Sequence, residues 1–179
     1  ALGDSLADCA GNFLTAPAAL ELARPWPPAP GTWIINEVLF NPWPGGSDYV
    51  ELYNASDRFM DLGDLMLRGG SSNNQRTANV SATSRLVPPQ TYMVLAENTA
   101  MVEQQYLARY PDRLVEVPDL PSLPDKEGEV VLMDRSMQVT DHMKYHEKMH
   151  FPLLSGTEGV ALERIHFGGS SADPSVWHS

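Results

Sequence analysis

The sequence predicts an all-β sandwich with one short helix. Segments rich in β-branched and aromatic residues recur along the chain, and several of them alternate apolar and polar residues with the period of two that is typical of a half-buried strand. The 179 residues include 15 prolines and 13 glycines, which suits many short strands joined by turns. The number of strand-like segments is enough for the two packed sheets of a sandwich.

The clearest pair of strands lies at residues 33–54. Ile34–Phe40 and Tyr49–Tyr53 are rich in β-branched and aromatic residues, and Asn41–Asp48 between them holds the prolines and glycines that break a helix and permit a reversal. We expect strands at about residues 34–40, 48–54, 64–68, 91–96, 129–133, 138–145 and 159–165.

One helix is expected to interrupt the strands. Asn98 or Thr99 can cap it, an apolar stripe at every fourth position runs from Val102 to Tyr110, and Pro111 is expected to end it. The stripe predicts that this helix packs on the core.

Two further segments do not look like central strands. Residues Gly69–Ser84 are polar with few apolar positions, so we expect a surface loop that is the least ordered part of the chain. Residues Glu116–Pro124 contain proline too often for a central strand and are expected to run along an edge.

Composition narrows the possible partners. Twelve basic and 23 acidic residues give a net charge of −11, which repels a phosphate backbone, so we expect no nucleic-acid partner. No apolar run approaches the roughly 20 residues of a membrane span, so we expect no membrane insertion. Cys9 is the only cysteine, which excludes a disulfide within the chain.

The strongest enzyme-like pattern is His146-Glu147-Lys148-Met149-His150. In zinc proteases, two histidines four residues apart on a helix bind Zn²⁺ and the glutamate acts as general base on the bound water. That hypothesis predicts a helix at 143–151 and stoichiometric zinc. The residues before His146 alternate as a strand does, and Pro152 disfavours a continuing helix, so we expect the pattern at a strand end instead. Incidental ion binding by His142, His146 and His150 is a further alternative.

A second alternative is a calcium site on the first two strands. Glu37, Asp48 and Glu51, with Asn36 and Asn41 nearby, could supply oxygen ligands to Ca²⁺ if their carboxylates converge. This alternative describes a calcium-dependent adhesion or glycan-binding module and predicts that Ca²⁺ raises the melting temperature. The alternative to a calcium site is a structural role for Glu37, which its position in the strand suggests.

Glu37 shares strand parity with Ile35 and Leu39. Its carboxylate can therefore be partly buried, with hydrogen bonds from backbone N–H groups or from an arginine such as Arg68 or Arg164.

Motifs in both halves of the chain resemble the lamin tail domain family. Ile35–Pro42, a Gly-rich loop, Asp48–Asn54 and Asp61-Leu62 are similar in order and spacing to the opening of that domain. Gly156–Ile165 and Ala172–Ser179 are similar to its last strand and closing turn in bacterial members. Tyr145 with Met149–Leu154 also matches the bacterial pattern, which makes His146 and Glu147 variable polar positions. Val176, Ala161 and Gly63–Leu65 depart from the usual residues.

The resemblance implies an immunoglobulin-like β-sandwich over residues 33–179. It also implies a non-catalytic module of a larger exported or cell-surface bacterial protein, with a structural, spacer or binding role. The expected partners are neighbouring modules of the same parent chain and a protein or glycan at the cell surface; no cofactor, metal ligand or catalytic residue is expected. Trp177 is expected to plug the end of the sandwich with its N–H on a backbone carbonyl.

Residues 1–32 are expected to be a leader or connector, because Arg24–Gly31 is rich in proline. The turn at Asp8–Asn12 is similar to the closing hairpin of bacterial immunoglobulin-like repeats, so this segment could instead be the end of a preceding module or an added strand.

Overall fold

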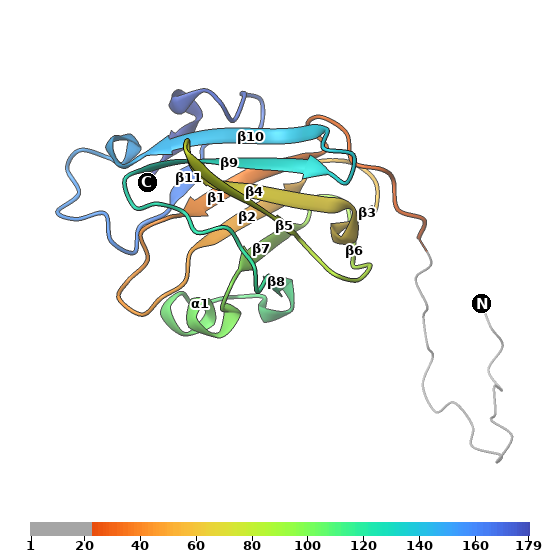
Figure 1. The fold of residues 1–179 in the computed structure, drawn as a ribbon, viewed down its shortest axis with the longest axis horizontal. Helices are drawn as coiled ribbons and strands as arrows, with labels where there is room; N and C mark the ends of the chain where they lie inside the picture. Colours follow the sequence, from red (N-terminus) through yellow and green to blue (C-terminus); the bar gives the residue numbers. More distant parts are fainter. Residues whose placement is uncertain (1–22) are drawn as a thin grey trace, which may run out of the picture.

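The computed structural model describes residues 23–179 and shows a β-sandwich (Figure 1). A six-stranded sheet and a four-stranded sheet pack face to face, and one short α-helix lies at an end of the larger sheet. The expected all-β sandwich with one short helix is therefore confirmed. Within the described residues, no helix has the length and apolar character that a membrane crossing requires.

The six-stranded sheet has the order β12-β11-β1-β2-β7-β8. Neighbouring strands are antiparallel except for the parallel pair of β7 and β8. The strands are β1 (Trp33–Leu39), β2 (Tyr49–Asn54), β7 (Tyr92–Ala96), β8 (Leu114–Glu116), β11 (Leu162–Arg164) and β12 (Trp177–His178).

The four-stranded sheet has the antiparallel order β10-β9-β4-β5. Its strands are β4 (Leu65–Ser71), β5 (Asn74–Asn79), β9 (Glu127–Asp134) and β10 (Val139–His146). Two short strands, β3 (Met60–Asp61) and β6 (Leu86–Val87), pair separately. Short 3₁₀ helices cover Leu62–Asp64, Pro111–Arg113, Glu147–Met149 and Pro174–Val176.

The main core lies between the two sheets. Alternate residues of each strand point inward, as Val50 and Leu52 do on β2 and Leu65 and Leu67 do on β4, and all four are fully buried. A smaller apolar cluster lies on the outer face of the six-stranded sheet, where α1 covers one end. Its buried members are Leu39, Tyr49, Ala96, Val102 and Ala161.

The expected loop at Gly69–Ser84 is wrong. Gly69–Ser71 belongs to β4, residues 72–73 turn, and β5 runs antiparallel to β4. Ala78 and Val80 point into the core, whereas most other residues of this stretch are exposed. β5 lies at the edge of its sheet and buries few side chains, so it needs few apolar residues. Its polar composition therefore concealed the strand.

The expected edge segment at Glu116–Pro124 is confirmed. It continues from β8 at the edge of the larger sheet, and Val117, Leu120 and Leu123 bury their side chains between the sheets.

The helix begins as expected but ends earlier. Asn98 caps α1 (Thr99–Gln105) by accepting a hydrogen bond from the Met101 N–H at 3.1 Å. The chain leaves the helix at Tyr106, whose ring packs edge-on against Tyr49, so Tyr110 is not part of the helix and is exposed. A helix this short depends on tertiary contacts, and these decide where it ends.

The connector is partly described. Trp26 makes a parallel bridge to Met60, and the Gly31 N–H donates to the Thr140 carbonyl at 3.0 Å, so residues 23–32 run along the sandwich. Cys9, the turn at Asp8–Asn12 and the rest of residues 1–22 lie outside the described residues.

Candidate functional site

The helix that the zinc-protease hypothesis requires is not formed. His146 is the last residue of β10, and a 3₁₀ helix at Glu147–Met149 separates it from His150. The Nδ1 atom of His146 accepts a hydrogen bond from the Lys148 N–H at 3.0 Å, which uses one of its two ring nitrogens. The pattern therefore lies at a strand end, as its context predicted.

The three histidines do not share a site. His142 and His146 lie four residues apart on an extended strand, about 13 Å apart at the rise of a strand. Each faces a glutamate of β9: His142 Nε2 is 3.2 Å from Glu129, and His146 Nε2 is 3.7 Å from Glu127. Within residues 23–179 no group of three or more His, Cys, Asp or Glu residues is placed to hold a metal ion.

His150 lies apart from them in the core. Its ring packs 5.3 Å from Phe40, and neither ring nitrogen finds a hydrogen-bond partner among the described residues. Burial lowers the pKa of His150, because the charged imidazolium would lose its hydration there.

The carboxylates of the calcium hypothesis do not converge either. Glu37 and Glu51 are directly opposed on β1 and β2, but Glu37 accepts a hydrogen bond from the Tyr49 hydroxyl and Glu51 accepts one from the Asn36 amide at 2.8 Å. Asp48 directly precedes β2 and accepts a hydrogen bond from the Leu123 N–H at 3.0 Å. Each carboxylate has its own structural partner.

Glu37 is a partly buried carboxylate, but among the described residues its hydrogen-bond donor is Tyr49 and neither a backbone N–H group nor an arginine. A β-bulge explains the difference. The register between β1 and β2 shifts between Ile35 and Glu37, so Ile35 points into the main core while Leu39 joins the outer cluster. Glu37 therefore lies on the outer face of the sheet, beside Tyr49 of the outer cluster. Arg164 instead pairs with Asp141 at 3.7 Å.

Burial strongly shifts the pKa values of the Glu37 and Glu51 carboxyl groups. It raises the pKa of Glu37 to about 7, against the lowering effect of the Tyr49 hydrogen bond, and it raises the pKa of Glu51 as well. Glu163, opposite Glu37 on β11, adds like charge to both.

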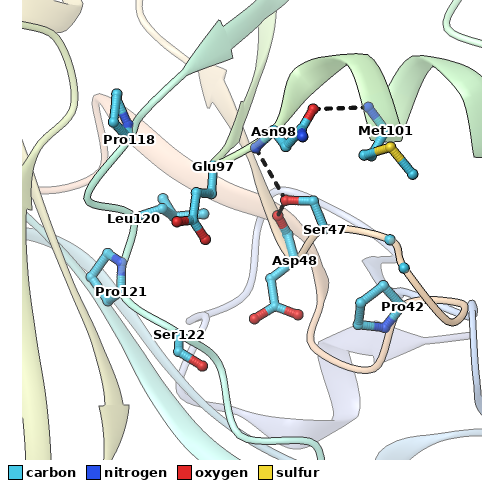
Figure 2. Close-up of a pocket in the computed structure, with 12 residues that line it drawn as sticks. Pro42, Ser47, Asp48, Glu97, Asn98, Met101, Pro118, Leu120, Pro121 and Ser122 are labelled. Atoms are coloured by element: carbon cyan, nitrogen blue, oxygen red, sulfur yellow. Dashed lines mark hydrogen bonds between the residues drawn. The ribbon is translucent and has the colours of Figure 1, made fainter.

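An acidic cleft of about 580 Å³ lies around Asp48 (Figure 2). Asp48 precedes β2 and Glu97 follows β7; because Tyr49 pairs with Ala96, these two acids stand side by side at the end of the sheet. Figure 2 shows both side chains reaching into the opening. The residues 42–48 form one wall and the residues 118–122 form the other.

Hydrogen bonds hold the cleft in shape. The Asn98 N–H donates to the Ser47 hydroxyl at 3.3 Å, which joins the start of α1 to the loop before β2. Asp48 joins the same loop to the opposite wall through the Leu123 N–H. The cleft is therefore fixed by contacts between three separate parts of the chain.

The chemistry of the cleft suits a basic group. Burial, together with the negative charges of Asp125 and Glu97, raises the pKa of Asp48 to about 6 against the lowering effect of the Leu123 hydrogen bond. Among residues 23–179, no histidine or basic residue lines the cleft. An ammonium or guanidinium group would relieve this unfavourable concentration of negative charge.

Sequence reasoning identified Asp48 but missed Glu97 and the wall at 118–122. A signal for Glu97 was its position directly after an expected strand, at the same edge as Asp48. No local signal marks the far wall, because more than 70 residues separate it from Asp48. No protein-family model matches this chain, and no curated protein matches it.

Proposed function

We propose that this chain is a non-catalytic, lamin-tail-like β-sandwich module of a larger exported or cell-surface bacterial protein, with a structural, spacer or binding role. The observation that carries the proposal is where three residues of the lamin-tail resemblance lie. Ile35, Arg164 and Trp177 take part in a buried clamp at one side of the sandwich. Their partners Asp141, Gly169 and Ser171 lie outside the motifs.

Arg164 is the centre of the clamp, with 1% of its side chain exposed. Its guanidinium donates to the Ile35 carbonyl at 3.1 Å, to the Gly169 carbonyl at 2.9 Å and to the Ser171 hydroxyl, and it lies 3.7 Å from Asp141. Asp141 also accepts the Ile35 N–H at 2.8 Å. The clamp thus joins β1 and β11 of one sheet to β10 of the other.

The closing turn completes the clamp. The Trp177 indole N–H donates to the Ser171 carbonyl at 2.9 Å, and the ring is 5% exposed, as the sequence predicted. The polar groups of these motif residues are used in hydrogen bonds within the fold, which supports a structural role for them. The acidic cleft, which lies elsewhere, supports the binding part of the role for a partner that tolerates negative charge.

The alternative from another class is a zinc-dependent hydrolase that uses His146, Glu147 and His150. Calorimetric titration of the purified chain with zinc, beside His146→Ala, separates the two classes. We expect weak or no binding, with the same result for His146→Ala and for the exposed control His166→Ala. Stoichiometric binding that only His146→Ala abolishes would overturn the proposal and favour the hydrolase. Melting curves with and without Ca²⁺ test the calcium alternative in the same samples, with no shift expected.

The placement of the module has its own test. Antibodies raised against the chain should label intact cells of the source bacterium without permeabilisation. Labelling that appears only after lysis would contradict an exported or surface role.

A further inference from the structure

A small hollow of about 210 Å³ lies on the outer face of the six-stranded sheet, beyond α1. The sheet supplies Glu51 from β2 and Tyr92 from β7, and the segment after the helix supplies Arg109, Tyr110 and Arg113. The hollow shares no lining residue with the acidic cleft. It is smaller than the roughly 300–1,000 Å³ of pockets for drug-sized ligands, so it suits a single ring.

Two arginines line this hollow, although the net charge of the chain is −11. The guanidinium carbons of Arg113 and Arg109 lie 4.3 and 5.4 Å from the centre of the Tyr110 ring. Neither arginine makes an ion pair within residues 23–179. Guanidinium groups held on an aromatic ring are oriented in advance, and they bind carboxylates through two parallel hydrogen bonds.

Glu51 gives the same hollow an acceptor. One of its oxygens accepts the Asn36 amide at 2.8 Å, and the other accepts no hydrogen bond from the described residues. Burial raises the pKa of Glu51, and nearby Arg113 only partly offsets the shift. The hollow therefore offers guanidinium donors on one side and a carboxylate acceptor on the other. A hydroxyl group can donate to that carboxylate.

We propose that this hollow binds one sugar ring that carries a carboxylate, a uronic acid within an otherwise neutral glycan. Its carboxylate would pair with Arg109 and Arg113, which the Tyr110 ring holds, its hydroxyls would donate to Glu51, and its C–H surface would lie against Tyr92.

Competing ligand chemistries fit less well. A phosphate or an acidic side chain would satisfy the arginines but would bring no donor to Glu51, whose carboxylate would then repel it. A polyuronate would be repelled by the net charge of −11. The proposal goes beyond the module role and does not depend on the placement of the parent protein.

Saturation-transfer NMR with methyl glucuronoside as the probe tests the proposal. Methyl glucoside, which has the same ring without the carboxylate, is the matched ligand control. We expect transfer to the ring protons of the glucuronoside and at least about tenfold weaker binding for the glucoside, because a hydrogen-bonded charge pair is lost. Arg113→Gln and Tyr110→Ala should each weaken glucuronoside binding by about the same factor or more.

Arg76→Gln is the matched protein control, because it removes one exposed arginine on β5, outside the lining of the hollow. It should leave glucuronoside binding unchanged, and melting curves should show that every variant is folded.

Several results would overturn the proposal. These are no transfer to the glucuronoside, equal binding of the glucoside, complete displacement by equimolar acetate, or tighter binding of free glycine, which carries an ammonium and a carboxylate without a sugar ring. Acetate displacement would reduce the site to general anion binding, and glycine binding would assign it to amino acids. An equal effect of Arg76→Gln would show that overall charge controls the signal.

Discussion

Glu37 shows how one residue can make stability depend on pH. Its carboxyl is enclosed by Tyr49 and the outer apolar cluster, and burial raises its pKa from 4.5 to about 7. A carboxyl whose pKa is higher in the folded state binds its proton more tightly there than in the unfolded chain. Its contribution to stability is therefore complete below pH 4.5 and is lost as the pH rises through about 7.

Replacing Glu37 by glutamine should remove this dependence, because glutamine keeps the shape and can still accept the Tyr49 hydroxyl. Between pH 4.5 and 8, the free energy of unfolding of the wild type should fall by up to about 3 kcal/mol relative to Glu37→Gln. Urea unfolding of both proteins across this range measures the difference. Exposed Glu103→Gln is the control, and parallel pH profiles for wild type and Glu37→Gln would contradict the prediction.

At the scale of elements, the β4–β5 hairpin is the part that the sequence concealed. Its pairing depends on Gly70, which adopts φ +131° and faces Asn74 so closely that a Cβ atom would overlap the Asn74 carbonyl oxygen. Gly70→Ala should therefore lower the free energy of unfolding by about 2 kcal/mol or more. Urea unfolding measures this loss.

Gly168→Ala is the matched control, because it has open space around the added methyl group and should change stability by less than about 0.5 kcal/mol. A neutral Gly70→Ala would instead favour the surface loop that composition suggested.

Local pattern was sufficient for some elements and not for others. The strands at residues 34–40 and 48–54 were predictable, because they are rich in β-branched and aromatic residues and turn residues lie between them. The strand at 138–145 was predictable because its residues alternate. β5 was not, because an edge strand with one buried alanine has almost no apolar signal. The position of Asp48 was predictable, but the cleft around it was not, because its far wall comes from residues 118–122.

At the scale of the whole molecule, the two sides of the sandwich differ. On one side, β10 faces β1, and the Arg164 clamp joins the two sheets. On the other side, the edge strands β5 and β8 border a hollow of about 710 Å³ lined by the residues 76–83 and 116–119. The sheets are thus fastened by polar groups on one side and by apolar packing of Val80 and Val117 on the other. The clamp should therefore contribute strongly to the stability of the whole fold.

Arg164→Met tests this contribution. Removing the guanidinium leaves the Asp141 carboxylate without its charged partner and leaves the Ile35 and Gly169 carbonyls without their side-chain donor. Loss of one partner of a buried ion pair typically costs about 3–5 kcal/mol, so Arg164→Met should lower the free energy of unfolding by about 3 kcal/mol.

Arg58→Met removes an arginine from an exposed pair with Asp57 at 3.2 Å and should cost less than about 1 kcal/mol. Both values come from urea unfolding at pH 7. Equal, small losses in the two variants would show that apolar packing alone joins the sheets. A large loss confined to Arg164→Met would show that the Arg164 clamp joins the two sheets.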